Sequence, residues 1–385
     1  MVKLVERAGE DRQILEAVAK VTAQFGHKAF MSAARKGEDA APLWKSLAEQ
    51  GFIGISIPEA YGGAGQGVSA LSLILEETAA QGCPMMNMVA FSVYVSVLIK
   101  HGSEAQKMYW LPRLASGQAR MAFAVTEPNA GTNTSNLQTR AVREGDDWCL
   151  SGTKYYITGV DVAEGILVVA RTGENPKTGR GLLSLFIVPV DAPGLTRTPI
   201  PTEINTPDRQ YTLFFDNVRL KNEALVGKEG DGLKVVFSGL NAERIIVASL
   251  CNGMARYAIE RACEYARTRK VWNAPIGTHQ AIAHPLAEAY ARLQASLLLT
   301  QRAADIYDSG QDAGEPSNIA KFIAADMAVF ALDRAIQTHG GNGMAQEYGL
   351  ADLWFIARVQ QIAPVSREMT LNYFAQHSLN LGRSY

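Results

Sequence analysis

Cysteine is scarce in this chain of 385 residues, and the four present, Cys83, Cys149, Cys251 and Cys263, are widely spaced. No CxxC pair occurs, so the sequence predicts neither a bound metal nor a disulfide framework. An excess of charge is also missing, because 37 Lys and Arg stand against 38 Asp and Glu for a formal net charge of -1. This balance offers no basic surface for nucleic acid or for an anionic membrane.

Long apolar runs are absent as well. The most apolar stretch, residues 85–99, is interrupted by Asn87, Ser92 and Ser96 and is shorter than the ~20 residues that a membrane span needs. The start, MVKLVERAGEDRQ, is polar and has no apolar core of a signal peptide. With 47% apolar and 19% charged residues, the composition is that of a globular protein. We therefore expect a soluble, cytoplasmic protein with no membrane span.

Three regions of different pattern follow one another along the chain. Residues 1–120 show apolar residues at helical spacing, whereas residues 121–229 contain short β-branched and aromatic runs separated by turn residues. The middle region predicts roughly six to eight strands. Helical periodicity returns in residues 230–385, where helices are expected at 231–268, 278–309, 315–340 and 349–382. This order is not the βαβ alternation of a doubly wound sheet, so we predict an α+β fold with three domains at these boundaries.

Two motifs in the middle region could present hydrogen-bond donors to a ligand. In Phe123-Ala-Val-Thr-Glu-Pro-Asn-Ala-Gly-Thr132, a strand leads into a loop that offers backbone N–H groups and two threonine hydroxyls. In Gly152-Thr-Lys-Tyr-Tyr-Ile-Thr-Gly159, strand alternation places Tyr155 and Tyr156 on opposite faces, with Thr158 on the face of Tyr156. Taken alone, the two patterns are better explained as a strand exit and a half-buried aromatic strand.

Two more motifs lie in the C-terminal helical region. Gln337-Thr-His-Gly-Gly-Asn-Gly-Met344 places three glycines after a helix, which either brings a ligand close to the backbone or simply ends the helix. The segment that begins Tyr265-Ala-Arg-Thr-Arg-Lys has a cluster of basic residues where a long helix ends. Such a cluster suits the helix dipole and could equally bind a pyrophosphate.

The order and spacing of these motifs resemble the acyl-CoA dehydrogenase family along essentially the whole chain. The motifs that carry the resemblance are PEAYGGAG, AVTEPNAGT, KYYITG, RKVWNAPIGTHQAI and QTHGGNGM. The resemblance implies an N-terminal helical domain, a middle β-domain, a C-terminal helical bundle, and one FAD per chain in a homotetramer or dimer. It also implies removal of the α-proton of an acyl-CoA thioester while the β-hydrogen leaves as hydride to flavin N5. Electrons would then pass to an electron-transferring flavoprotein.

The resemblance also implies which residues contact FAD. The loop that cradles the flavin and pyrophosphate is matched by Phe123, Val125, Thr126, Gly131 and Thr132. The positions beside the flavin ring are matched by Tyr156 and Thr158. The stretch that reaches FAD from a neighbouring subunit is matched by Arg269, Trp272 and Gln280. The contacts at the adenosine end and in the last loop over the cofactor are matched by Gln337, Gly340, Gly341, Ser366 and Glu368.

The catalytic base departs from the commonest family pattern. Many members place the catalytic Glu in an Ile-Tyr-Glu-Gly-Thr loop, and the matching loop here, Ile362-Ala-Pro-Val-Ser366, has Pro364 at that position. Proline cannot accept a proton, and it lacks the N–H that helps to polarise the thioester carbonyl in the family. The base position instead resembles that of isovaleryl-CoA dehydrogenase-like members, whose glutamate on the long helix matches Glu243 here.

Helical geometry around Glu243 favours a base. Its neighbours one turn away are Gly239, Leu240, Ile246 and Val247, so an apolar surrounding should raise the pKa of the carboxyl group. The alternative is a structural salt bridge to a lysine or arginine elsewhere.

We expect substrate contacts from Asn241 and Arg244 beside the base and from Phe91 and Tyr94 on the acyl side. The bulk of the last two hints at a short, branched or cyclic acyl group, as in fatty acid or branched-chain acyl metabolism. Because of Pro364, other functions stay open: a flavin-dependent oxidase, monooxygenase or enoyl-CoA reductase on the same fold, or a catalytically silent flavoprotein.

Overall fold

The N-terminal part of the chain is helical. The structure is a computed structural model that describes residues 9–177, 179 and 181–383, so the first eight residues of the polar N-terminal stretch lie outside the described part. The helices are α1 (Gly9–Lys36), α2 (Ala41–Glu49), α3 (Gly67–Ala80), α4 (Asn87–His101) and α5 (Glu104–Ala115). Most residues of α3 and α4 are buried, because both helices pack against the long helix that opens the C-terminal region.

An eight-stranded sheet forms the middle of the chain, within the predicted six to eight strands. Its strands are β1 (Met121–Ala124), β2 (Arg140–Glu144), β3 (Asp147–Thr158), β4 (Gly165–Glu174), β5 (Gly181–Pro189), β6 (Leu195–Ile200), β7 (Gln210–Leu220) and β8 (Leu225–Val226). The order is β6-β7-β3-β2-β4-β5-β8, and β1 pairs with β4 in parallel. β2 and β6 are mostly exposed, so apolar alternation does not mark them in the sequence.

The end of β3 differs from its prediction. The pairing of β3 with β7 shifts register between Lys154 and Ile157, and Tyr156 adopts a positive φ of 57°. The rings of Tyr155 and Tyr156 consequently lie side by side, with centroids 4.4 Å apart. The prediction that these two tyrosines lie on opposite faces of a regular strand is therefore wrong, because a β-bulge interrupts the alternation.

The C-terminal region is a helical bundle. Its helices are α6 (Gly232–Thr268), α7 (Gln280–Asp308), α8 (Gly314–His339), α9 (Leu350–Val359) and α10 (Arg367–Tyr373), followed by a π-helical turn (Phe374–Ser378). A short hairpin, β9 (Lys270–Val271) with β10 (Ala274–Pro275), joins α6 to α7. The prediction of one helix over 349–382 is wrong, since residues 360–366 interrupt it. Pro364 stands in that interruption, and proline has no N–H with which to continue a helix.

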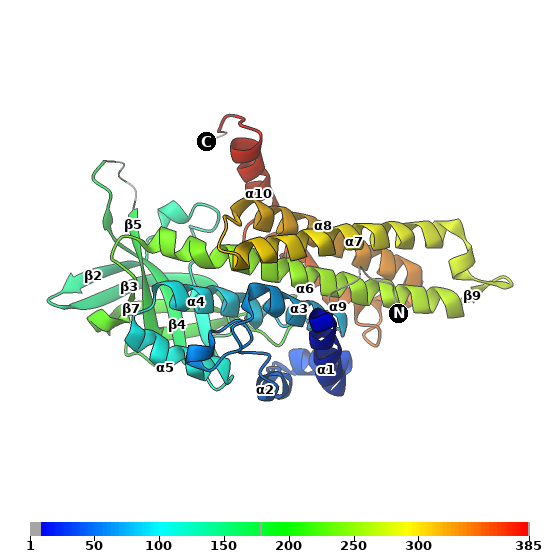
Figure 1. Cartoon of the computed structure of the whole chain (residues 1–385), viewed down its shortest axis with the longest axis horizontal. Coiled ribbons are helices and arrows are strands. Elements are labelled where there is room, and N and C mark those ends of the chain that lie inside the picture. Colours follow the sequence, from blue (N-terminus) through cyan, green and yellow to red (C-terminus); the bar gives the residue numbers. More distant parts are fainter. Residues whose placement is uncertain (1–8, 178, 180, 384–385) are drawn as a thin grey trace.

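Helix α6 connects the two ends of the molecule. Its first residue, Gly232, packs against the backbone of Leu183 in β5, and its last turn leads into the β9–β10 hairpin. At roughly 1.5 Å per residue, its 37 residues span about 55 Å. Figure 1 shows the sheet at one end of the long axis and the hairpin at the other. Residues placed at the two ends of α6 therefore cannot meet within one chain.

Buried charges fix α6 against α3. Arg256 of α6 pairs with Glu76 and Glu77 of α3, and all three side chains are almost fully buried. One turn earlier, a Cβ on Gly253 would lie 2.1 Å from the carbonyl oxygen of Glu76, so only glycine permits this approach. The close contact holds the N-terminal helices on the same long helix that carries Glu243.

Candidate active site

Glu243 is a buried carboxyl group in the middle of the helical core. Its side chain is 6% exposed, and its Oε2 atom is buried without a hydrogen-bond partner. Burial raises the pKa of Glu243 to about 8, although the positive charges of Arg244 and Lys321 act in the opposite direction. The predicted upward direction is thus confirmed. Within the described residues Glu243 forms no ion pair, so the alternative of a structural salt bridge has no support.

Two cations lie beside this carboxyl group. Arg244 donates from Nη1 to Asn241 Oδ1 at 2.9 Å, while its buried Nε has no acceptor. Lys321 of α8 is 1% exposed and donates from Nζ to the carbonyl oxygen of Val365. Lys321 was not predicted from the sequence. The available signal was a lysine among Ala320, Ala324 and Ala325, where the small residues of a buried helix face leave an ionisable group out of place.

The 362–366 loop offers no carboxylate. Its residues are Ile362, Ala363, Pro364, Val365 and Ser366, and the hydroxyl of Ser366 accepts the backbone N–H of Met369 as the cap of α10. The nearest acid after the loop, Glu368, is exposed. Glu243 is therefore the buried carboxyl group that this part of the structure supplies.

The β-domain brings one set of predicted cofactor residues together, which we call the flavin half-site. Its members are Phe123, Val125, Thr126, Gly131, Thr132, Tyr156 and Thr158. The loop after β1 is joined to β3 by a backbone hydrogen bond from the N–H of Tyr155 to the carbonyl oxygen of Thr126, at 2.9 Å. Tyr156 is 52% exposed, and the space where a Cβ of Gly131 would stand is open. The half-site is thus an open surface lined by an aromatic ring and hydroxyl groups.

A buried ion pair holds the flavin half-site in place. Lys154 is fully buried and donates to Glu127 Oε1 at 2.9 Å and to the carbonyl oxygen of Val125 at 2.8 Å. Glu127 also accepts the backbone N–H groups of Gln138 and Thr139, at 2.7 and 2.9 Å. Both charged residues lie inside motifs that predict cofactor contacts, but no function was predicted for either of them from the sequence. Here they join the two ends of the loop that includes Thr126 and Gly131.

Thr158 already has a hydrogen-bond partner. Its hydroxyl donates to Gln210 Oε1 at 3.1 Å across the β3–β7 pair. A ligand that accepts from Thr158 must therefore compete with Gln210, which is a second residue that the sequence analysis did not single out.

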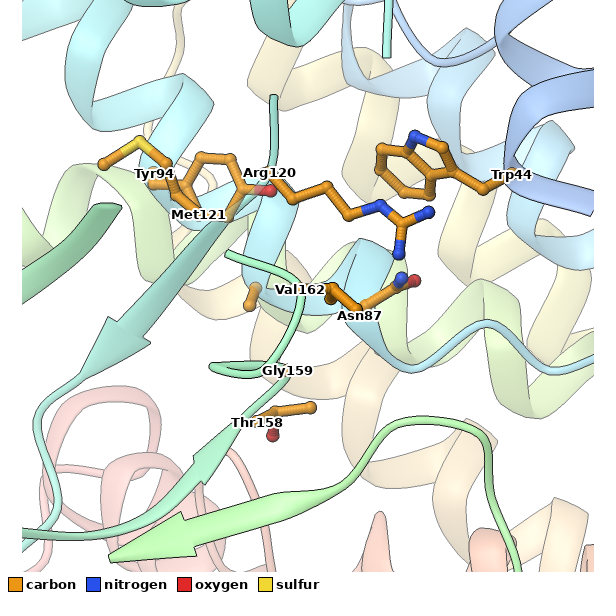
Figure 2. Close-up of a pocket in the computed structure, with 9 residues that line it drawn as sticks. Trp44, Asn87, Tyr94, Arg120, Met121, Thr158, Gly159 and Val162 are labelled. Atoms are coloured by element: carbon orange, nitrogen blue, oxygen red, sulfur yellow. The ribbon is translucent and has the colours of Figure 1, made fainter. Parts of the chain in front are cut away.

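A pocket adjoins the flavin half-site at Thr158. Figure 2 shows Arg120 reaching across it towards Trp44, with Asn87 below. The pocket is lined by Trp44, Asn87, Ala90, Tyr94, Arg120, Met121, Thr158, Gly159 and Val162. Arg120 is already paired with Asp39 at 2.9 Å and lies over the Trp44 ring at 4.4 Å. The pocket therefore offers no unpaired cation to a ligand.

The two predicted acyl-side residues contact this same region. Phe91 packs edge-on against Trp44 and Tyr94, with ring centroids 6.2 and 5.5 Å apart, and Tyr94 lines the pocket. The part of α4 that approaches α6 is instead Val93, whose carbonyl oxygen would lie 2.9 Å from a Cβ on Gly239. A substrate contact from Phe91 or Tyr94 stays a prediction.

Six more of the predicted cofactor residues gather at the far end of α6, in what we call the hairpin half-site, whereas Ser366 and Glu368 lie at the start of α10. Its members, all exposed, are Arg269, Trp272, Gln280, Gln337, Gly340 and Gly341. The end of α8 is tied to the end of α6, because Tyr265 stacks on His339 at 4.3 Å and accepts a hydrogen bond from Asn342 at 3.1 Å. Trp272, at the tip of the hairpin, is 85% exposed. The motifs alone did not predict that Gln337, Gly340 and Gly341 lie at the same end of α6 as Arg269.

Each half-site fits one part of an FAD molecule. The flavin half-site presents an exposed tyrosine ring and an open loop, which suit a flat ring system and the start of a pyrophosphate. The hairpin half-site presents Arg269, which forms no ion pair with any described residue, and open space beside Gly341. An arginine without a carboxylate partner suits a phosphate group. The flavin half-site lies in the sheet, which packs against the start of α6, and the hairpin half-site lies where α6 ends (Figure 1).

Comparisons with known proteins identify the family. Residues 8–118, 122–218 and 230–379 match the acyl-CoA dehydrogenase N-terminal, middle and C-terminal domains. Acyl-CoA dehydrogenase FadE12 of Mycobacterium tuberculosis (strain ATCC 25618 / H37Rv) is 47% identical over 380 residues, which cover 98% of each chain. A solved butyryl-CoA dehydrogenase from Megasphaera elsdenii has a TM-score of 0.92 at 28% identity, over 98% of this chain and 100% of that one. A glutaryl-CoA dehydrogenase from Mycobacterium smegmatis, solved in complex with FADH2, has a TM-score of 0.90 at 26% identity, over 98% and 97%.

The fold and the site thus define an FAD-dependent oxidoreductase of the CH–CH class. The chain belongs to the acyl-CoA dehydrogenase family. The resemblance drawn from the motifs and the expected α+β fold are both confirmed. Within the described residues, no helix is long and apolar enough to cross a membrane.

Proposed function

We propose that this protein dehydrogenates an acyl-CoA thioester at its α,β bond with FAD as cofactor, and that Glu243 is the base. One observation carries the choice of base: Glu243 is buried with an unpartnered oxygen, and the 362–366 loop has no carboxylate. Family membership supports the dehydrogenation itself. An oxidase, monooxygenase or reductase on the same fold is not favoured by any feature of the described site.

The residues around Glu243 suit the removal of a weakly acidic proton. A carboxylate in an apolar pocket is poorly solvated, so it is a stronger base than one in water. Arg244 and Lys321 supply the charge that lets Glu243 ionise in spite of its burial. When bound, FAD supplies the acceptor for the hydride. The chain itself accepts and stores the proton on the Glu243 carboxylate.

Arg244 is our proposed partner for the thioester oxygen. Pro364 removes the backbone N–H that the family uses there. Arg244 Nε is a buried donor without an acceptor, and its guanidinium group is held in place by Asn241. A donor aimed at a developing oxyanion stabilises the transition state. Asn241 would therefore position Arg244, which would contact the substrate.

A panel of acyl-CoAs mixed anaerobically with the purified protein tests the function. We expect one FAD per chain, and we expect bleaching of the flavin absorbance by acyl-CoAs of short or branched chain. Oxygen uptake measured in parallel should stay slow. Rapid oxygen uptake would indicate an oxidase instead, and a flavin that no acyl-CoA bleaches would contradict the proposal.

We also infer that the cofactor site is shared between two chains of a homo-oligomer, either a dimer or a tetramer. The support is geometric: the flavin half-site and the hairpin half-site lie at opposite ends of a helix about 55 Å long. In a two-fold assembly, each flavin half-site faces the partner's hairpin half-site. An electron-transferring flavoprotein is the electron acceptor that the family suggests, and the cytoplasmic location stays a prediction from composition.

Two matched glycine variants test the shared site. Gly131 and Gly341 have open space at the Cβ position and ordinary φ, so tryptophan should be tolerated by the fold at each and should block FAD. Gly131→Trp and Gly341→Trp should each bind little FAD. When the two variants are unfolded together and refolded as an equal mixture, about half of the pairs should contain one chain of each kind. Each such pair has one intact site of two, so the mixture should bind about a quarter of the FAD that the wild type binds.

The stoichiometry of this mixture is decisive. Absorbance at the flavin band, per mole of chain, measures recovery, and each variant refolded alone is the control. A mixture that binds no more FAD than its parents would show that each chain completes its own site.

A further inference from the structure

Lys321 is a buried lysine without a carboxylate in hydrogen-bond contact. It stands on the face of α8 that packs along α6, and its Nζ donates to the carbonyl oxygen of Val365. Lysine is almost never fully buried unless its charge is paired. The acid nearest along its own helix, Asp326, is already engaged, since it accepts from Gln361 Nε2 at 2.8 Å and from Arg367 Nε at 3.0 Å. The charge of Lys321 therefore needs another explanation.

The contacts of α8 hold both ends of one loop. Asp326 binds the residues that flank the loop, Gln361 and Arg367, while Lys321 binds its centre at Val365. Two backbone hydrogen bonds at the edge of the loop complete this arrangement: the N–H of Arg367 donates to the carbonyl oxygen of Gln361 at 2.9 Å, and the N–H of Thr370 in α10 donates to that of Ser366 at 3.1 Å. Lys321 also lies near Glu243, because Ser317, one turn earlier on α8, donates to Asn241 Oδ1 of α6 at 3.4 Å.

The charged surroundings of Glu243 and Lys321 are few. On Glu243 act Arg244 from its own helix and Lys321 from α8. On Lys321 act Cys251, Glu243 and Arg244 from α6 and Asp326 from α8. From α10, Tyr373 acts on Arg244. Among the described residues outside α6, Lys321 is thus the one cation that favours ionisation of Glu243, while burial lowers the pKa of Lys321 itself to about 8.

We propose that Lys321 is a positioning residue that anchors the 362–366 loop through the carbonyl oxygen of Val365 and, by its charge beside Glu243, holds that side chain ready to accept a proton. The second half rests on the proposed function of Glu243. The loop lies where many family members carry their catalytic base. Lys321 would therefore stabilise a loop that has no carboxylate and would also act on Glu243, the base at the alternative position.

A purely structural lysine would satisfy the Val365 carbonyl and leave the titration of Glu243 unchanged. Three variants of the FAD-loaded protein separate the two possibilities. Lys321→Met loses charge and donor, Lys321→Gln keeps a donor without charge, and Lys321→Arg keeps both. The ionisation of Glu243 is measured without substrate, as the carboxylic acid infrared band that Glu243→Gln lacks. The loop is measured by hydrogen exchange of the amides of Arg367 and Thr370.

In Lys321→Met we expect two changes. The midpoint of the infrared titration should move up by about 1–3 pH units, because a neighbouring positive charge is lost. Exchange of the loop amides should become about tenfold faster or more, as expected for the loss of one hydrogen bond from a charged donor. Lys321→Gln should show the shifted titration with a smaller change in exchange, and Lys321→Arg should restore both towards the wild type.

Failure of this proposal can be told apart from failure of the proposed function. An unchanged titration midpoint and unchanged amide exchange in Lys321→Met would overturn the assignment of Lys321, whatever Glu243 does in catalysis. A titration shift in Lys321→Gln that equals the shift in Lys321→Met supports the charge effect, even where Lys321→Met folds poorly. Neither readout uses turnover, so the base itself is judged by the separate Glu243→Gln experiment.

Discussion

Glu243→Gln should bind FAD normally and reduce it with acyl-CoA about 10²–10⁴ times more slowly than the wild type, the usual effect of losing a general base. The change keeps the size and helix propensity of the side chain and removes its proton acceptor. No carboxylate in the 362–366 loop can replace it. Rapid mixing under anaerobic conditions, with the flavin absorbance as signal, gives the rate.

The assignment of Glu243 as the base also predicts how the flavin reduction rate of the wild type depends on pH. A base acts in its ionised form, so the reduction rate should rise with pH through the pKa of Glu243, which is about 8 in the protein without substrate. Stability should move in the opposite direction. Folding raises the pKa of the Glu243 carboxyl group above its ordinary value of 4.5, so protonation of this group stabilises the folded state. This contribution to the free energy of unfolding is complete below pH 4.5 and is lost as the pH rises through about 8. Glu243→Gln should therefore gain stability relative to the wild type at high pH.

A matched control is available on the neighbouring helix. Glu288→Gln on α7 makes the same chemical change at an exposed glutamate that pairs with Arg292 one turn away. It should leave both the reduction rate and its pH profile unchanged. Flavin reduction by Glu243→Gln at the wild-type rate would exclude Glu243 as the base.

Lys154→Met, a change in the buried ion pair that holds the flavin half-site, should lower the free energy of unfolding by about 3–5 kcal/mol. It leaves Glu127 buried with no cation. Burial alone would raise the pKa of Glu127, but Lys154 and the backbone donors of Gln138 and Thr139 outweigh burial and hold it below its ordinary value. Without Lys154, the loop that includes Thr126 and Gly131 loses one of its contacts with β3 and keeps the backbone hydrogen bond between Tyr155 and Thr126. Denaturant titration measures the stability, and flavin absorbance per chain should fall with it.

A second change should partly rescue this variant. In Lys154→Met with Glu127→Gln, the buried charge is gone, while the amide oxygen of the new side chain can still accept from the backbone N–H of Gln138 or of Thr139. Removing both members of a buried ion pair is often close to neutral. A double variant no more stable than Lys154→Met would show that the charge pairing is not what holds the loop.

The helices and the base could be predicted because their signals are local. Helical periodicity marks α6 and α8, and a glutamate among Gly239, Leu240, Ile246 and Val247 is expected to be desolvated whatever surrounds the helix. The bulge at Tyr156 could not be predicted in this way, because it depends on the register with β7, a strand more than fifty residues away. The burial of Lys321 and of Lys154 could not be predicted for a similar reason. A buried lysine needs a hydrogen-bond partner, and the partners here, Val365 and Glu127, are brought near only by the tertiary fold.

The separation of the cofactor residues into two half-sites also could not be predicted from the sequence. The motifs around Thr126 and around Gly340 look alike in the sequence, as glycine-containing loops that suit a phosphate. Only the length and direction of α6 place them at opposite ends of the molecule. Motif order therefore predicted the family and the cofactor, whereas the grouping of the residues had to come from the structure.

The exposed indole of Trp272 at the hairpin tip has a thermodynamic consequence. A chain on its own keeps this ring in water, 85% exposed, together with the unpaired charge of Arg269. In a shared site, FAD binds to a surface that exists only after two chains have met, so cofactor binding and assembly are linked equilibria. Each strengthens the other by the same factor. Dilution then releases cofactor as well as chains, and a rising supply of FAD draws the chains together.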